Sequence, residues 1–147
     1  MYKNLLVATD GSKLSGKAVA HAIGLAKRLG AKVTAFYAAP EAPLPMYSDG
    51  VTYQPVSRKE YAEAMEKEAA RILGAVAARA KAAGVACTTL HAIAASPWEA
   101  ILAAAKKSRC DAIVMASHGR RGITALLLGS ETQKVLAHSK IPVVVVR

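Results

Sequence analysis

The feature that most constrains the fold is a regular alternation of short apolar runs with longer segments of helical periodicity. Strands are predicted at Leu5–Thr9, Lys32–Ala38, Val85–His91, Ala112–Ser117 and Pro142–Val146. The segments between them place apolar residues three or four positions apart, which indicates amphipathic helices. Strands that alternate with helices form a parallel sheet covered on both faces. The chain is therefore expected to be α/β, with five strands and four helices.

The helical segments carry signals at their ends, and they begin near Leu14, Tyr61, Ser96 and Gly129. Gly30 and Gly84 follow the first two helices, where glycine supplies a left-handed cap. Ser96 precedes Pro97, and Glu99 comes three residues after Ser96. This pattern predicts a capping box with Ser96 as the N-cap.

The topology follows from the rules for parallel sheets. Right-handed crossovers produce an open, doubly wound sheet, whose ligand crevice lies beyond the carboxyl ends of the strands where the strand order reverses. A length of 147 residues suits a single domain, and we take residues 1–147 as that domain. Functional residues are therefore expected at strand ends.

Composition narrows the classes of function. The chain has 20 Lys and Arg against 10 Asp and Glu, a net charge of +10 that attracts polyanions such as nucleotides, nucleic acid or anionic membranes. No apolar run is long enough for a membrane span or a signal peptide, so a cytoplasmic location without membrane attachment is expected. Cys87 and Cys110 lack the spacing of a metal site or a disulfide framework, and we interpret them as small apolar residues.

The most informative segment runs from Met115 to Thr132. It follows an apolar strand, contains Gly119 and Gly129, and enters a helix whose first turn carries the hydroxyls of Ser130 and Thr132. Amides at a helix N-terminus, next to glycines that allow close backbone approach, suit a phosphate group. This segment therefore predicts a phosphate site that needs no catalytic side chain.

Other residues at strand ends allow two readings each. Asp10 either accepts hydrogen bonds from a ribose hydroxyl or an adenine amino group, or forms a strand-to-helix turn in which Ser12 caps the helix. His118 either approaches a phosphate or ribose, or is a surface turn residue. Arg120 and Arg121 either clamp phosphates or are solvated.

A second glycine pattern, from Gly11 to Gly16 and Lys17, has P-loop spacing. Residue 18 is alanine, so the hydroxyl that would hold Mg²⁺ is missing. Lys17 is predicted to lie on the solvated side of the first helix. We interpret this match as accidental.

One connection, Pro40 to Val56, is longer than ordinary loops and is rich in proline. Loops of this length without regular structure are usually lids, binding loops or disordered segments. Both a mobile connector and a lid for substrate or partner remain open.

The chain resembles the universal stress protein family along nearly its whole length. The resemblance rests on Asp10-Gly11-Ser12, the segment from Gly119 to Thr132, and the terminal Ile-Pro-Val-Val-Val-Val. ATP-binding members carry Gly-x2-Gly-x9-Gly-[Ser/Thr]; Gly119, Gly129 and Ser130 match, and Ala116 replaces the leading glycine. The resemblance implies nucleotide contacts from Ala8, Thr9, Asp10, Ala38, Met115, Ala116, His118, Gly119, Gly129, Ser130, Glu131 and Thr132.

The resemblance also implies a Rossmann-like fold of the adenine nucleotide alpha hydrolase type, with strand order 3-2-1-4-5. It implies homodimers and a bound adenine nucleotide, ATP or AMP, with or without Mg²⁺. Members are stress-linked and at most feeble ATPases, so the chain is not expected to be an enzyme. From the residues themselves, Pro142–Val146 is expected to be an apolar edge strand that pairs with its copy in a homodimer.

Three functions stay open at this stage. The first is a stress-response regulator or sensor that binds an adenine nucleotide. The second is a structural or interaction protein of the stress response that needs no nucleotide. The third is a nucleic-acid binder, which the charge allows but the 5% aromatic content and the absence of a recognition motif disfavour.

Overall fold

The computed structural model describes residues 1–54, 56–119 and 127–147. Its strands are β1 (Asn4–Ala8), β2 (Lys32–Ala39), β3 (Met46–Ser48), β4 (Val51–Tyr53), β5 (Cys87–Ile93), β6 (Ala112–Ala116) and β7 (Val143–Val146). Its helices are α1 (Lys13–Leu29), α2 (Arg58–Ala82), α3 (Pro97–Lys107) and α4 (Ser130–His138). The main sheet is parallel, in the order β5-β2-β1-β6-β7. The predicted doubly wound fold, its order 3-2-1-4-5 and its four helices are confirmed.

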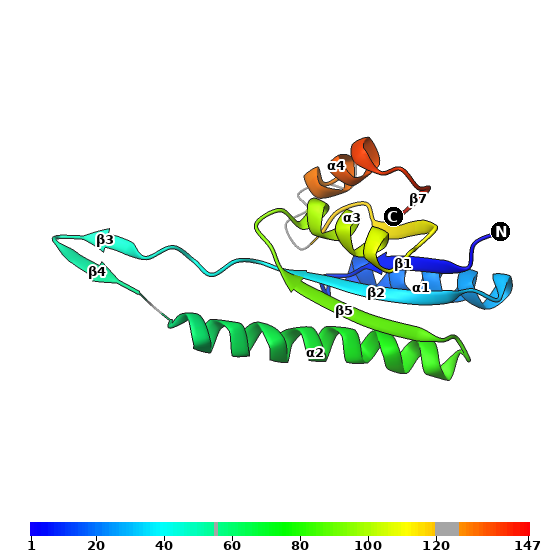
Figure 1. Cartoon of the computed structure of the whole chain (residues 1–147), viewed down its shortest axis with the longest axis horizontal. Coiled ribbons are helices and arrows are strands. Elements are labelled where there is room, and N and C mark those ends of the chain that lie inside the picture. The colour runs from blue at the N-terminus through cyan, green and yellow to red at the C-terminus, as the bar shows by residue number, and fades with distance from the viewer. Residues whose placement is uncertain (55, 120–126) are drawn as a thin grey trace.

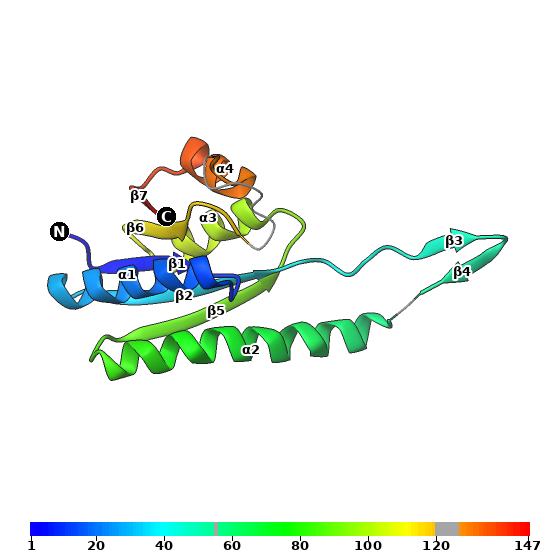
Figure 2. The ribbon, with the colours of Figure 1, turned by 180° about the vertical axis from the view of Figure 1, so that it is seen from behind.

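The helices cover the sheet as two layers, with α1 and α2 on one face and α3 and α4 on the other (Figure 1; Figure 2 shows the reverse view). The central strands are the most apolar part of the chain, and Leu5, Leu6 and Ile113 are completely buried. Side chains alternate between the faces of a strand, so Leu5 packs with α1 while Leu6 packs with α3. This alternation decides which of the two helical layers each residue at the strand ends packs against.

The two edge strands differ from the central ones. Residues of β6 are buried throughout, whereas β5 alternates between half-buried and exposed positions and β7 is half-buried. The expectation of strands covered on both faces holds for β1, β2 and β6 but was wrong for β5. Although β5 packs against α2, as an edge strand it is covered less completely than the central strands, so it needs no continuous apolar sequence.

Helix ends follow the local signals in most places. Ser12 caps α1 by accepting a hydrogen bond from the Ser15 amide, and Gly30 has a φ of 64°, as expected for a left-handed cap. The start of α2 differs from the prediction: the helix begins at Arg58 rather than near Tyr61, and Ser57 and Glu60 form a reciprocal capping box there. The hydrogen bonds from Ser57 hold the pKa of Glu60 below its ordinary value.

The predicted capping box of α3 was wrong. Ser96 is the N-cap residue, but its side chain makes no capping hydrogen bond. The amide of Trp98 instead donates to Glu131 Oε2 at 2.9 Å. A carboxylate from α4 thus satisfies the start of α3, a long-range contact that local spacing does not reveal.

The long connection is not structureless. β3 and β4 form an antiparallel hairpin, joined by a two-residue turn in which Asp49 has a φ of 51° and Gly50 a φ of 76°. Asp-Gly suits this turn because both positions need left-handed backbone. The hairpin projects well beyond the main sheet (Figure 1). We call the segment Pro40–Gln54 the arm.

The other differences are shifts of one or two residues. The first strand begins at Asn4 and ends at Ala8, the second ends at Ala39, the third runs Cys87–Ile93 and the fourth ends at Ala116. Pro142 lies outside β7, although its carbonyl accepts a hydrogen bond from the Ile113 amide. The second helix ends at Ala82 and Gly84 follows with a φ of 74°. No helix in the described part of the chain is long and apolar enough to span a membrane.

Candidate functional site

The predicted crevice corresponds to the edge of the sheet at which β1 and β6 end side by side. These strands pair directly, with Leu5 opposite Ala112, so their carboxyl ends reach the same edge of the sheet. A Cβ built on Gly119 would lie 2.8 Å from Asp10 Oδ2. The structure therefore brings together the two strand ends that the sequence singled out.

Asp10 and its neighbours form a tight turn into α1. Asp10 Oδ1 accepts a hydrogen bond from the Ser12 amide at 2.9 Å. The buried hydroxyls of Thr9 and Ser15 lie 2.9 Å apart, and the Gly11 amide donates to Thr9 Oγ1 at 3.2 Å. The turn reading of this segment, with Ser12 as cap, is confirmed. In this turn Asp10 Oδ1 accepts from the Ser12 amide, while Asp10 Oδ2 faces Gly119.

The start of α4 is tied to the end of β6. The Gly129 amide donates to the Ser117 carbonyl at 2.7 Å, and Thr132 Oγ1 donates to the Ala116 carbonyl at 3.0 Å. Gly129 is the N-cap, and among the described residues no side-chain cap hydrogen bond is made at this helix start, which Ser130 opens. Within the described residues this helix start thus offers backbone donors at the crevice.

Gly129 has a packing reason to be glycine. A Cβ there would lie 3.0 Å from the Cα of His118 and 3.3 Å from the Ser117 carbonyl oxygen. The half-buried His118 ring places Nδ1 3.2 Å from the Ser117 hydroxyl. The loop after β6 and the start of α4 are therefore in close backbone contact.

Three predicted apolar contacts lie on one face of the sheet. Met115 is buried, and Ala8 and Ala38 are half-buried beside it in the cluster that includes α3. They come from the carboxyl-terminal parts of β6, β1 and β2. Together they form an apolar floor on the side of the sheet that α4 covers, of a kind that suits a planar base.

Two predicted residues are used elsewhere in the fold. Ala116 is 7% exposed and its methyl group packs in the cluster on the α1 side, away from this floor. The Glu131 carboxylate accepts from the Trp98 amide and pairs with Lys134 Nζ at 3.3 Å. Arg120 and Arg121, for which a phosphate clamp was considered, lie outside the described residues.

The P-loop pattern leads to an ordinary helix start. Lys17 is exposed on α1 and Ala18 is completely buried. We expect Lys17→Ala to change the affinity for an adenine nucleotide by less than about twofold, measured by calorimetry. A loss of tenfold or more, about 1.4 kcal/mol, would move the phosphates to α1.

Both cysteines are free, and burial raises the pKa of each thiol, which lowers its reactivity at neutral pH. In the described ranges, no group of three or more His, Cys, Asp and Glu side chains is arranged to hold a metal ion.

The chain matches the universal stress protein family over residues 1–147 and belongs to it. Universal stress protein YxiE from Bacillus subtilis is 34% identical, with all of both chains covered. Among solved structures, the universal stress protein UspA from Lactobacillus plantarum aligns with a TM-score of 0.77 at 25% identity, covering 99% of this chain and 98% of that one.

A second similar structure contains a ligand. It is a universal stress protein in complex with cAMP, 28% identical, with a TM-score of 0.71 and coverage of 99% of this chain and 97% of that one.

Proposed function

We propose that this chain binds an adenine nucleotide, ATP or AMP, in the crevice after β1 and β6, and acts as a regulator or sensor in the stress response. The observation that carries the proposal is a combination on one side of the sheet. The floor of Ala8, Ala38 and Met115, the Asp10 carboxylate and the start of α4 all meet at the carboxyl ends of the strands. A relative of the same family in complex with cAMP supports the assignment.

The chemistry of each part suits one part of the nucleotide. The apolar floor packs against adenine, and Asp10 accepts a hydrogen bond from a ribose hydroxyl or the adenine amino group. Phosphates lie toward the backbone amides of α4, where the helix dipole favours negative charge. No lysine of P-loop type assists them, so we expect an affinity in the micromolar range or weaker.

The proposal includes no chemical step. His118 is paired with Ser117 and the Glu131 carboxylate is held by α3 and Lys134, so neither is placed as a free base at the crevice. The side chains at this site bind the nucleotide and orient it. Any ATP hydrolysis is therefore expected to be feeble.

A second candidate function follows from the glycines. A Cβ on Gly129 would crowd the His118 backbone at 3.0 Å, and a Cβ on Gly119 would displace the Asp10 carboxylate, so local packing favours glycine at both positions without a ligand. This observation favours an interaction protein of the stress response that needs no nucleotide. The two functions differ in one measurable property, which is nucleotide binding by the purified protein.

The test is calorimetric titration of Asp10→Asn with ATP and AMP. Asparagine keeps the oxygen that accepts from the Ser12 amide, but it replaces an acceptor oxygen with a donor and removes the charge. We expect affinity to fall about tenfold or more, because a hydrogen bond to a charged group contributes about 1.5–3 kcal/mol. The melting temperature should change little.

Asp111→Asn is the matched control. Asp111 accepts from the amides of Lys3 and Asn4 at the opposite end of the same sheet, so its loss of charge should leave nucleotide affinity unchanged. If the wild-type protein binds neither nucleotide at millimolar concentration, the nucleotide-independent function replaces the proposal.

Assembly is the remaining part of the proposal. β7 is an edge strand of four valines without a charged residue, and such an edge recruits another chain. Pairing with its own copy about a two-fold axis would close a homodimer.

A further inference from the structure

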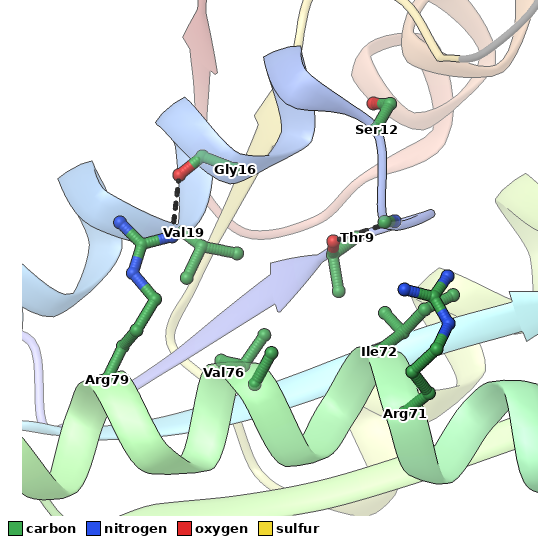
Figure 3. A pocket seen from close by; sticks show the side chains of 10 residues that line it. Thr9, Ser12, Gly16, Val19, Arg71, Ile72, Val76 and Arg79 are labelled. Atoms are coloured by element: carbon green, nitrogen blue, oxygen red, sulfur yellow. Dashed lines mark hydrogen bonds between the residues drawn. The ribbon is translucent and has the colours of Figure 1, made fainter.

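A pocket of about 160 Å³ lies between α1 and α2, on the face of the sheet opposite to α4. Figure 3 shows its floor, where the side chains of Val19, Ile72 and Val76 approach one another from the two helices. Arg71 and Arg79 stand along α2 at its rim (Figure 3). The pocket thus combines an apolar floor with a cationic border.

The two arginines differ in their pairing. Arg71 makes an ion pair with Glu68 at 2.6 Å. Arg79 donates to the carbonyl of Gly16 at 3.2 Å, and no carboxylate among the described residues lies within ion-pair distance of it. A carbonyl leaves the positive charge of Arg79 uncompensated. The pocket therefore favours an apolar or aromatic group next to an acidic one.

The arm presents that combination. Its register places Met46, Val51 and Tyr53 on one face, each more than 60% exposed, while Tyr47 on the other face is 79% exposed. Asp49 lies at the turn between them. A two-stranded hairpin is at best marginally stable alone in water, so an arm with these exposed side chains needs a covering surface.

The distribution of charge favours a second copy of this chain as the covering surface. The arm contains Glu41 and Asp49 and no lysine or arginine, a net charge of −2. The rest of the chain carries all 20 Lys and Arg against the other 8 Asp and Glu, a net charge of +12. The arm is thus attracted to the body of another copy, whereas two bodies repel each other.

The length of the arm matches the length of α2 from Arg58 to Arg79. From Pro40 to the turn at Asp49, an extended chain spans about 30 Å. Along α2, the distance from Arg58 to Arg79 is also about 30 Å at the helical rise. An arm laid antiparallel along the α2 of a second copy, with the two arm bases adjacent, therefore places its tip at the pocket.

We propose that this chain self-associates by reciprocal exchange of arms, in which each arm lies along α2 of the other copy and its tip occupies the pocket between α1 and α2. A two-fold axis relates the two contacts, so this interface joins two copies and leaves neither arm nor pocket of the pair unfilled. Arg79 pairs with Asp49 of the other copy, and the apolar side chains of the arm cover the pocket floor. This interface does not involve β7. Its pocket borders the nucleotide crevice, because Thr9, Gly11 and Ser12 of the turn after β1 also line it.

The proposed pairing of the arm tip with Arg79 is tested by exchanging the charges of the two sides. The mass of each variant is measured by sedimentation velocity at tens of micromolar. Asp49→Asn with Thr52→Lys makes the tip positive and keeps a residue that tolerates the left-handed turn position. Arg79→Glu makes the rim negative. Each change alone is expected to halve the mass of the wild-type assembly, and the two together in one chain are expected to restore it.

Arg28→Glu is the matched control, because it reverses an exposed charge near the other end of α1, outside the pocket. It should leave the mass unchanged. Far-UV circular dichroism and melting of each variant separate loss of assembly from loss of folding, and the tip residues lie outside the core. Three results would each overturn the proposal. The wild type could be monomeric, both single variants could keep the wild-type mass, or the combined variant could fail to restore that mass.

Discussion

Replacing Gly129 with valine is expected to abolish adenine-nucleotide binding, with a loss of more than about 100-fold, or ~2.7 kcal/mol. A Cβ at this position would lie 3.0 Å from the Cα of His118 and 3.3 Å from the Ser117 carbonyl oxygen. Backbone atoms have no alternative rotamer, so the loop after β6 and the start of α4 must move apart. The phosphate donors then lose their position relative to Asp10. Overpacking of this kind also costs about 1–3 kcal/mol of stability.

Gly74→Val is the matched control for this variant. Gly74 lies on an exposed part of α2, and a Cβ there meets nothing within 4 Å. Its affinity for ATP and AMP in calorimetry should equal that of the wild type. If Gly129→Val also binds with wild-type affinity, the phosphates do not lie at the start of α4.

Replacing Val145 with proline is expected to separate the pair of copies that we propose to be joined through β7, seen as a halved sedimentation mass. The Ile113 amide donates to the Pro142 carbonyl and the Ser117 amide to the Val146 carbonyl. In a parallel ladder this pattern directs the amides of Val144 and Val146 to β6 and that of Val145 outward. Proline at 145 therefore removes a donor of the free edge and leaves the ladder to β6 in place.

Replacing Val144 and Val146 with lysine is expected to lower the stability of the fold as well as to oppose edge pairing. Both valines pack against the cluster on the α1 side, so lysines there lower stability by burying charge as well as opposing edge pairing. Val145→Pro separates these effects, because its melting temperature measured on the isolated halves should stay near the wild-type value. An undiminished mass for Val145→Pro would show that β7 does not pair with its copy.

Much of the fold was predictable because its signals are local. The apolar runs that became β1, β2 and β6 can be buried only inside a covered sheet, and Gly30 needed a left-handed position at the end of α1. The hairpin of β3 and β4 also carries a local signal, because Asp49-Gly50 suits a two-residue turn; the sequence alone had predicted only a mobile connector or a lid here.

The candidate site was predictable only as a set of strand ends. That Asp10 follows one strand and Gly119 another is visible in the sequence, and the reversal of strand order places them together. Their orientation was not predictable. The Ala116 methyl group lies on the α1 side while Met115 lies on the other face, because neighbouring residues of a strand point to opposite faces.

The sequence by itself determined the order of elements, the parallel sheet and the crevice at its carboxyl edge, because hydrophobic periodicity and turn chemistry depend on residues close together in the chain. Tertiary structure alone decided the partners of the polar groups that bond across the fold. Glu131 caps α3 from α4, Thr132 donates to the end of β6, and Arg79 borders a pocket formed with α1. These contacts join residues that are 16 or more positions apart, or 63 for Arg79 and Gly16, and only the packing of helices on the sheet brings them within hydrogen-bond distance.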